Sequence, residues 1–380
     1  MIMKTIANYP AERLFSLDVL RGLDMLLLTV VGPLVEAAQR SWQCFPNGIM
    51  AQFRHAWGGF TLWDIIMPLF IFMCGAAIPF ALERRLRQGK YVFWRHVLLR
   101  VVLLWFLGGL VQGDWATLDP LKMSPYCNTL QTIAIGYLTV ATVMLTGSQV
   151  MTIVVPVILA LGYTFLLSFG GDYSEFGNMA YKIDHTILRS LLPEGSLRVT
   201  KPSSYTWFMT SMMFAVMAFA GYHATQILRS NKNQWRKVVI LLAYAAVLLF
   251  IGFVSEIWIP CIKHIFTLSF TAQAMGWCVL ALCVLFVITD IWKFRLGATI
   301  FLFFGQMALA AYFTSNFFKP VLDSFSHCVI DGVVVLLPDS AGPFVICLFS
   351  IMGMVLVMFG WRKCRRKSEN VDSVGVARGN

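Results

Sequence analysis

Apolar stretches of about twenty residues recur along this chain and are separated by short polar segments. A helix rises about 1.5 Å per residue, so such a stretch matches the roughly 30 Å hydrocarbon core of a bilayer. A transmembrane β-barrel would instead show segments of about ten residues with alternating apolar and polar positions. Hydrophobic residues make up 58% of the chain and charged residues 13%, which excludes a soluble globular core. The sequence therefore predicts an all-α, polytopic integral membrane protein.

The apolar stretches define about ten predicted transmembrane helices, without a short-period repeat or a separate soluble domain. We expect a single transmembrane domain over residues 1–361, followed over 362–380 by a polar, disordered cytoplasmic tail. The predicted helices cover residues 16–35, 62–82, 97–112, 128–146, 150–169, 207–228, 237–256, 264–289, 296–318 and 341–361.

The distribution of Lys and Arg predicts the orientation of these helices. With a cytoplasmic N-terminus, the inner segments hold 21 of the 30 Lys and Arg residues. This asymmetry follows the positive-inside rule, so both termini are predicted to be cytoplasmic. The net charge of +11 then requires no nucleic-acid partner, because a basic inner face is ordinarily explained by anionic lipid headgroups. Membrane lipids are therefore predicted partners.

Several segments on the predicted outer side are long enough to fold over the mouth of the helical bundle, namely 36–61, 170–206 and 317–340. Four cysteines are predicted on this side, where an oxidising environment permits disulfides: Cys44, Cys127, Cys261 and Cys328. Four cysteines allow three pairings, and free thiols are the alternative. No spacing of Cys and His is typical of a metal site.

The most unusual segment is residues 53–80, FRHAWGGFTLWDIIMPLFIFMCGAAIPF. His55 is predicted just outside the membrane, where an imidazole can accept and return protons at physiological pH. Asp64 begins the following helix, so its carboxylate either caps that helix or holds the imidazole in one tautomer. A purely structural role is the alternative for each side chain, and for a single histidine it is the commoner one.

Charged residues at the start of the first helix indicate a second polar site, on the cytoplasmic side. Asp18 and Arg21 are three residues apart, and an ion pair between them would lower the cost of placing charge on an apolar helix. The guanidinium of Arg21 also suits a phosphate ligand. Further positive charge comes from a basic segment containing Arg84, Arg85, Arg87, Lys90 and Arg95.

Two more polar clusters fall at predicted helix ends. Asn128 and Gln131 lie where the fourth helix begins, and amides inside a membrane bundle most often join helices by hydrogen bonds. The outer segment IPCIKHIFTLSF carries Lys263 and His264 near the interface, where long side chains commonly extend toward water. Together with His55, these side chains are predicted to gather polar groups on one face.

Four spaced motifs stand in order over roughly residues 13–315. They comprise Ser16, Leu17, Asp18, Val19, Leu20, Arg21 and Gly22; His55, Trp57, Gly59, Thr61, Asp64, Pro68, Phe70, Phe72 and Gly75; Leu130, Gln131 and Tyr137; and Pro260, Lys263, Thr267 and Ser269. In this combination the chain resembles the transmembrane acyltransferases related to heparan-α-glucosaminide N-acetyltransferase, including their bacterial relatives. Structural roles within the motifs are expected for Asp18, Gly22, Trp57, Gly59, Pro68, Tyr137 and Thr267.

The resemblance implies an enzyme that takes an acetyl group from cytosolic acetyl-CoA and delivers it across the membrane. The implied acceptor is an amino sugar or another glycan, and acetyl-CoA is a cosubstrate rather than a permanently bound cofactor. The implied location is the bacterial inner membrane. A homodimer is one of the assemblies that the sequence leaves undecided. His55 matches the active-site histidine of the family, and the count of charges independently places it on the acceptor side.

Two catalytic routes stay open on these residues. A neutral His55 either deprotonates the acceptor for direct attack on the thioester, or is itself acetylated and passes the group on. Arg21 would contact acetyl-CoA, and Lys263, Asn128 or Gln131 would donate hydrogen bonds to the oxyanion. Two rival functions are a transporter of a small solute and a membrane scaffold descended from an inactive acyltransferase. Binding of CoA would separate the enzyme from both.

Overall fold

A computed structural model of the chain describes residues 14–335, 338 and 341–377. The described residues form helices and connecting segments and contain no strand, which confirms the predicted all-α class. A helix occupies every range that the apolar stretches predict to span the membrane. Six helices are long and apolar enough to cross a bilayer, or seven if the bent pair Ala298–Gln306 and Ala308–Phe317 counts as one. The number of ten spans and the orientation of the termini stay predictions.

The chain divides into two compact units, and the single transmembrane domain over 1–361 stays a prediction. The first unit contains the residues up to Leu20 together with Ala51–Leu296. The second contains Arg21–Met50 and the residues from Gly297 onward. The division falls inside α2 (Phe15–Leu26), so the first predicted span contributes to both units.

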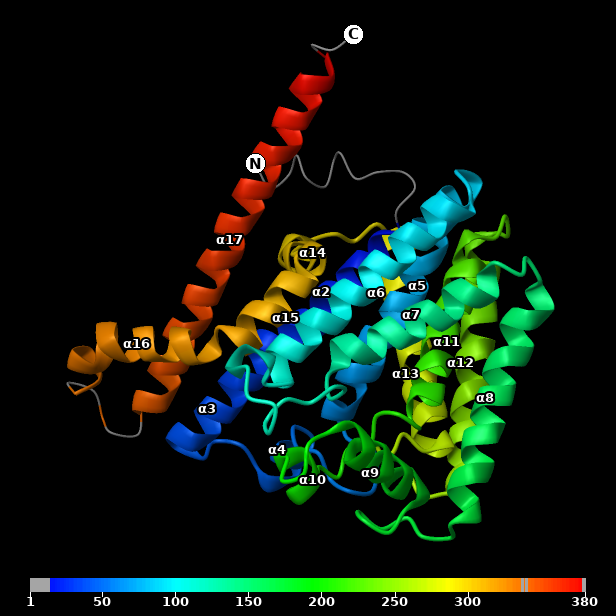
Figure 1. Cartoon of the computed structure of the whole chain (residues 1–380). Coiled ribbons are helices and arrows are strands. Elements are labelled where there is room, and N and C mark those ends of the chain that lie inside the picture. The colour runs from blue at the N-terminus through cyan, green and yellow to red at the C-terminus, as the bar shows by residue number, and fades with distance from the viewer. Residues whose placement is uncertain (1–13, 336–337, 339–340, 378–380) are drawn as a thin grey trace. The chain divides into compact units, whose positions relative to one another are not determined.

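The first unit is a bundle in which α11 is the central helix. It packs against α5, α7 and α8, while α12 pairs with α13 and α6 pairs with α7 (Figure 1). The bundle helices are α5 (Ile66–Arg87), α6 (Lys90–Gln112), α7 (Thr129–Met144), α8 (Gln149–Phe169), α11 (Ser211–Arg229), α12 (Gln234–Glu256) and α13 (Leu268–Phe286), the last continued by η4 (Val287–Ile291). The buried residues of α11 itself are mostly small or aromatic, and small residues are typical of close packing between membrane helices.

Two glycines allow α5 and α11 to approach closely. A Cβ atom at Gly75 would lie 1.9 Å from the carbonyl oxygen of Ala218, and one at Gly221 would lie 1.9 Å from that of Phe72. Backbone atoms cannot move aside as a flexible side chain can, so any side chain here would push the helices apart. The positions therefore require glycine for packing.

The ends of the bundle are formed by short turns at one side and folded loops at the other. The segment 83–100, predicted as a cytoplasmic connection, is helical except for a turn at Gln88 and Gly89 between α5 and α6. The predicted outer segment 170–206 contains α9 (Met179–Leu191) and α10 (Leu197–Thr200), which lie at the lower end of the bundle in Figure 1.

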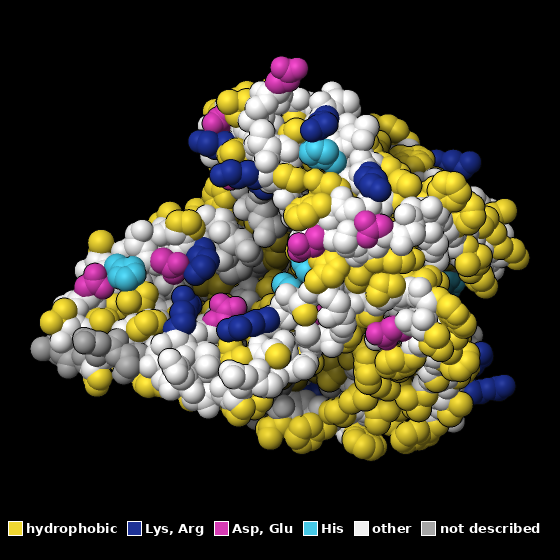
Figure 2. Space-filling model, turned by 90° about the horizontal axis from the view of Figure 1, so that it is seen from below, with side chains coloured by type: hydrophobic (Ala, Val, Ile, Leu, Met, Phe, Trp, Pro, Cys, Tyr) yellow, Lys and Arg dark blue, Asp and Glu magenta, His cyan; other side chains and the backbone are white. Residues whose placement is uncertain are grey.

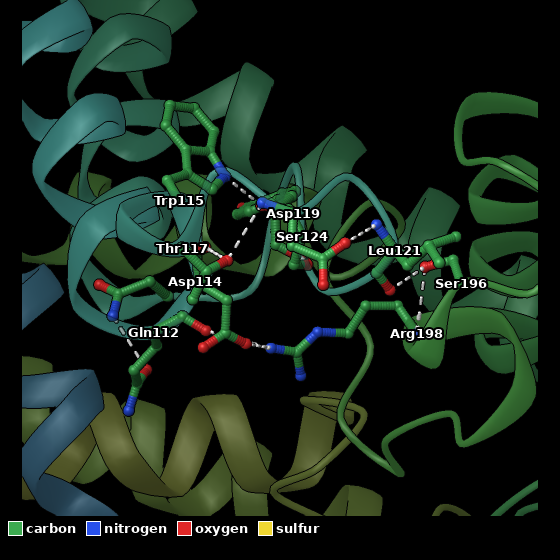
Figure 3. A network of polar contacts seen from close by, with 11 residues as sticks. Gln112, Asp114, Trp115, Thr117, Asp119, Leu121, Ser124, Ser196 and Arg198 are labelled. Carbon is green, nitrogen blue, oxygen red and sulfur yellow. Dashed lines mark hydrogen bonds and ion pairs between the residues drawn. The ribbon is translucent and has the colours of Figure 1, made fainter.

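A polar network holds the segment between α6 and α7, which includes η3 (Trp115–Thr117), against α10 (Figure 3). Arg198 forms an ion pair of 2.8 Å with Asp114, and the Ser196 hydroxyl donates to the carbonyl of Leu121 over 3.2 Å. The Trp115 indole N–H donates to the carbonyl of Ser124 over 2.7 Å. These contacts satisfy loop groups that have no helical partner.

The second unit contains the rest of α2, η1 (Leu27–Val31), α3 (Gly32–Trp42) and the C-terminal helices α14 (Ala298–Gln306), α15 (Ala308–Phe317), α16 (Lys319–Val334) and α17 (Gly342–Ala377). A Cβ at Gly22 would lie 1.7 Å from the carbonyl oxygen of Phe301, so α2 and α14 approach through this glycine. The segment 317–340, expected to be a loop, contains α16 instead. The segment 362–380, predicted to be a disordered tail, continues α17 as helix to Ala377.

Candidate active site

The start of α5 is fixed by a reciprocal cap between Thr61 and Asp64. Asp64 Oδ2 accepts hydrogen bonds from the Thr61 backbone N–H at 2.9 Å and from its hydroxyl at 2.8 Å. Thr61 is the N-cap of η2 (Leu62–Ile65), the short turn that leads into α5. The spacing of three residues lets each residue satisfy a free group of the other. The helix-capping role predicted for Asp64 is therefore present in the structure.

The other carboxylate oxygen of Asp64 holds His55 and Lys263. His55 Nδ1 lies 2.7 Å from Asp64 Oδ1, and Lys263 Nζ lies 3.2 Å from the same oxygen. Lys263 Nζ is also 3.1 Å from His55 Nδ1 and 3.4 Å from His55 Nε2. Asp64 thus serves both of the roles that the sequence left as alternatives, and the predicted gathering of His55 with Lys263 is observed.

The exposure of the three side chains differs sharply. The side chains of Asp64 and Lys263 are 1% and 4% exposed, whereas that of His55 is 36% exposed. A carboxylate can only accept hydrogen bonds, so the 2.7 Å contact assigns the ring proton to Nδ1. Nε2 of His55 then carries the lone pair, which has the Lys263 ammonium 3.4 Å away. The arrangement is a buried ion pair that presents one basic imidazole nitrogen.

Burial lowers the pKa of Lys263 from 10.5 to about 8, and the charge of Asp64 opposes that shift. The ammonium is therefore charged at neutral pH and loses its proton in a mildly alkaline range. The ammonium, 3.4 Å from His55 Nε2, is placed to stabilise negative charge that develops on a substrate oxygen held beside that nitrogen.

Lys263 reaches this position through the connection between α12 and α13. The backbone N–H of Gly59 donates to the carbonyl of Cys261 over 2.8 Å, which joins the His55 segment to this connection. Gly59 has a φ of +97°, a conformation that glycine adopts without steric cost. Thr267 caps α13 and also accepts from the backbone N–H of Ile262 over 3.1 Å. The motif residues Gly59 and Thr267 therefore position Lys263.

An aromatic cluster lies beside the triad formed by His55, Asp64 and Lys263. The ring of His264 stacks on Trp57 with centroids 5.1 Å apart, and Tyr205 contacts it at 4.1 Å. His264 Nδ1 is buried without a hydrogen-bond partner in the described part of the chain. The Trp57 indole N–H donates to the carbonyl of Tyr173 over 3.2 Å, so the cluster is tied to the segment before α9.

Sequence reasoning missed Tyr205, which comes from the segment before α11. That segment is held by Asp184 of α9, whose carboxylate accepts from the backbone N–H groups of Trp207, Phe208 and Met209. Burial raises the pKa of Asp184, and the three donors oppose the shift. A single tyrosine in a polar segment carries no signal that would have identified it.

The amides Asn128 and Gln131 form a helix cap at the start of α7. Gln131 Oε1 accepts from the backbone N–H groups of Cys127 and Asn128, and its Nε2 donates to the carbonyls of Pro125 and Trp105. Asn128 Oδ1 accepts from Leu130 over 2.7 Å. Both the oxygen and the nitrogen of the Gln131 amide are used in these hydrogen bonds, which favours the structural role over the predicted oxyanion contact.

The structure places the remaining predicted residues on α2, α5 and α7. Tyr137 is buried in α7 under the guanidinium of Arg100, 4.5 Å from the ring centroid, and Pro68 is buried in the first turn of α5. Asp18 and Arg21 belong to α2, and their ion pair stays a prediction.

Figure 2 looks onto the end of the molecule that carries α9 and α10, where acidic, basic and histidine side chains lie among hydrophobic ones.

All nine cysteines belong to the described residues and are free thiols, so none of the disulfides considered from the sequence is formed there.

Comparison with known proteins supports the motif-based resemblance. No protein-family model matches the chain. Heparan-α-glucosaminide N-acetyltransferase of Homo sapiens is 24% identical over 368 residues, which cover 81% of this chain and 53% of that protein. The Mus musculus protein of the same name is 23% identical over 363 residues, covering 80% and 53%. The chain spans about half the length of these curated relatives. Across about four fifths of its own length, it is therefore related to acetyltransferases of this type.

Proposed function

We propose that this chain is a membrane acyltransferase that moves an acetyl group from cytosolic acetyl-CoA to an extracytoplasmic acceptor, an amino sugar or another glycan. The observation that carries the proposal is the contact of His55, Asp64 and Lys263, in which a half-exposed imidazole is oriented by a buried ion pair. The acetyltransferase names of the relatives support the reaction class.

The first chemical step uses Nε2 of His55. With its Nδ1 proton held by Asp64, the imidazole takes a proton at Nε2 from the acceptor amine or hydroxyl. The acceptor attacks the thioester carbonyl, a C–N or C–O bond forms, and the C–S bond to CoA breaks. The proton passes from the imidazole to the leaving thiolate, so the enzyme returns to its initial state. The same nitrogen would attack the thioester in the alternative route through acetyl-histidine.

Lys263 is the proposed electrostatic partner of the oxyanion. Its ammonium lies 3.4 Å from Nε2, so a carbonyl oxygen held beside that nitrogen would be within reach of an N–H donor. Asp64 compensates the charge of Lys263 before substrate binds, which lowers the cost of burying the cation.

The donor is proposed to enter from the opposite end of the bundle. Asp64 precedes α5, and Arg84, Arg85 and Arg87 end it, after 22 helical residues or roughly 33 Å. This length requires the pantetheine arm to extend along the bundle toward His55. Arg21 stays a predicted phosphate contact.

The test uses sealed proteoliposomes with labelled acetyl-CoA on one side and a panel of amino sugars on the other. We expect acetylated sugar to form only across the membrane and only with His55 intact. His55→Ala should abolish transfer, whereas His327→Ala, a change at an exposed histidine of α16, should leave it unchanged. Activity of His55→Ala equal to that of the parent protein would refute the assignment. Absence of CoA binding in titration calorimetry would favour a transporter or scaffold.

A further inference from the structure

A groove outside the active site lies between α11 and α12. Its volume is about 560 Å³, within the range of about 300–1,000 Å³ that is usual for small-molecule sites. It is formed at the turn between the two helices, whereas Lys263 follows the other end of α12. Because α12 has 23 residues, its two ends are roughly 35 Å apart, so the polar end of the groove and Lys263 lie near opposite ends of this helix.

The chemistry of the groove changes along its length. Ile240, Ala243 and Val247 of α12 line it at a spacing of three and four residues, so they form one aliphatic face. Toward the turn, the lining changes to Ser230 and Lys232. His223 also lines the groove and is fixed by a 2.9 Å contact between its Nε2 and the carbonyl of Thr152 on α8. One end is therefore apolar and the other polar and basic.

Two of the four cations at the turn are not balanced by an acidic residue of the described chain. Residues 229–237 include Arg229, Lys232, Arg236 and Lys237 and contain no Asp or Glu. Arg229 is neutralised by Glu83 at 2.6 Å, and Lys237 Nζ donates to the carbonyl of Leu228 over 2.7 Å. In the part of the chain that the structure describes, the exposed side chains of Lys232 and Arg236 have no ion pair. Of these two cations, Lys232 lines the polar end of the groove, and Arg236 belongs to the first turn of α12.

We propose that this groove binds one anionic phospholipid, with its phosphate at Ser230 and Lys232 and one acyl chain along the aliphatic face of α12. Charge complementarity selects the anionic headgroup. Only 22% of the apolar window of α12 is buried in the protein, so the groove opens toward the bilayer rather than toward water. An aliphatic wall on that side fits an acyl chain and offers little to the polar nucleotide end of CoA.

The experiment compares lipids of one chain length by native mass spectrometry of the purified full chain. We expect the protein to retain phosphatidylglycerol at least 5-fold more than phosphatidylcholine, because an uncompensated cation favours an anionic headgroup. At about 1.4 kcal/mol per tenfold change, this ratio corresponds to about 1 kcal/mol. Lys232→Gln should remove most of this preference. Lys90→Gln, at an exposed lysine beginning α6, is the matched control and should keep it.

A second pair of variants tests the acyl-chain end. Ala243→Trp should fill the groove and lower retention of both lipids, whereas Ala246→Trp, also exposed on α12 but outside the groove, should not. Circular dichroism and thermal unfolding of each variant establish that it is folded. If Ala243→Trp does not fold, Lys232→Glu replaces it as the second test and should abolish the preference for phosphatidylglycerol.

Three outcomes would overturn the proposal. They are equal retention of the two lipids, equal effects of Lys232→Gln and Lys90→Gln, and displacement of phosphatidylglycerol by acetyl-CoA with loss of CoA binding in Ala243→Trp. The last would assign the groove to the cosubstrate. Since none of the readouts depends on acetyl transfer, failure here leaves the proposed reaction at His55 untouched.

Discussion

The carboxylate of Asp64 does two things at once, since one oxygen caps a helix and the other orients His55 and Lys263. This division makes the site rigid, because the group that positions the imidazole is itself fixed by the backbone of Thr61. A capping carboxylate in most proteins faces solvent, whereas this one is 1% exposed and has its charge balanced by Lys263. The catalytic proposal therefore depends on a buried ion pair.

Replacing Asp64 with Asn separates these two functions. The amide can still cap Thr61, but it cannot hold the Nδ1 proton as a carboxylate does, so the wrong tautomer becomes available. We expect kcat to fall roughly 100-fold or more, with a small change in KM. Steady-state kinetics in proteoliposomes measures both. Asp119→Asn, at a half-exposed loop carboxylate, is the control, and a kcat for Asp64→Asn within threefold of the parent would contradict the role.

Lys263 predicts a dependence on pH. Its pKa is lowered to about 8, so the ammonium is charged below that pH and is lost as the pH rises through it. If the cation stabilises the oxyanion, the ratio of the parent rate to the Lys263→Met rate should be largest below pH 8 and fall above it. Taking the ratio removes the titration of the acceptor amine. Lys201→Met, at an exposed lysine, should give a flat ratio, and a flat ratio for Lys263→Met would contradict the role.

Gln131→Ala distinguishes a cap from an oxyanion contact. Loss of the amide leaves buried carbonyl and N–H groups unpaired at the start of α7, which should cost about 1–3 kcal/mol of stability. The turnover of the folded fraction should stay within a few-fold, whereas loss of an oxyanion donor typically costs 100- to 1,000-fold. Unfolding by SDS titration and kcat together decide between the two roles.

At the scale of helices, the central packing of α11 depends on glycine. Gly221→Ala would place a methyl group 1.9 Å from a backbone oxygen of α5, so the helices must separate, at a cost of about 1–3 kcal/mol. Gly162→Ala in α8 is the matched control, since its added methyl would meet only the flexible Met212 side chain at 3.5 Å. That change should be neutral or slightly stabilising. Equal unfolding midpoints for the two variants in detergent would contradict the proposed close packing.

The elements that sequence reasoning found and missed differ in a physical property. Long apolar helices can be recognised from the sequence, because burial in lipid requires an unbroken run of apolar residues. The shorter helices α9 and α16 carry mixed sequences such as MAYKIDHTILRSL, in which charged residues interrupt any apolar run of membrane length. Their helical state is decided by packing and caps, such as Asn178 at the start of α9.

For the whole molecule, the predicted orientation places His55 and the α11–α12 turn on opposite sides of the membrane. Ala56→Cys should react with a membrane-impermeant maleimide added to intact cells, whereas Asn231→Cys should react only after the membrane is opened. Both positions are exposed, and the exposed Cys44, Cys328 and Cys364 are first replaced with Ser. Labelling of Asn231→Cys but not Ala56→Cys in intact cells would reverse the orientation and remove the basis for transfer to an outer acceptor.

The sequence alone determined that this is a helical membrane protein, and it located the ranges of its apolar helices. Both follow from quantities read along one dimension, the length of an apolar run and the thickness of a bilayer. It also selected His55, Asp64 and Lys263 as candidates, through their motifs.

Only the tertiary structure decided that Lys263, 208 residues from His55, shares one carboxylate oxygen with it. It likewise assigned Gln131 to a helix cap and brought Tyr205 beside His264. Contacts between distant residues depend on how close the helices approach and how the connections fold, and neither is encoded in a local pattern. The bilayer therefore fixes the class of fold from local composition, whereas side-chain packing between helices and loops creates the site.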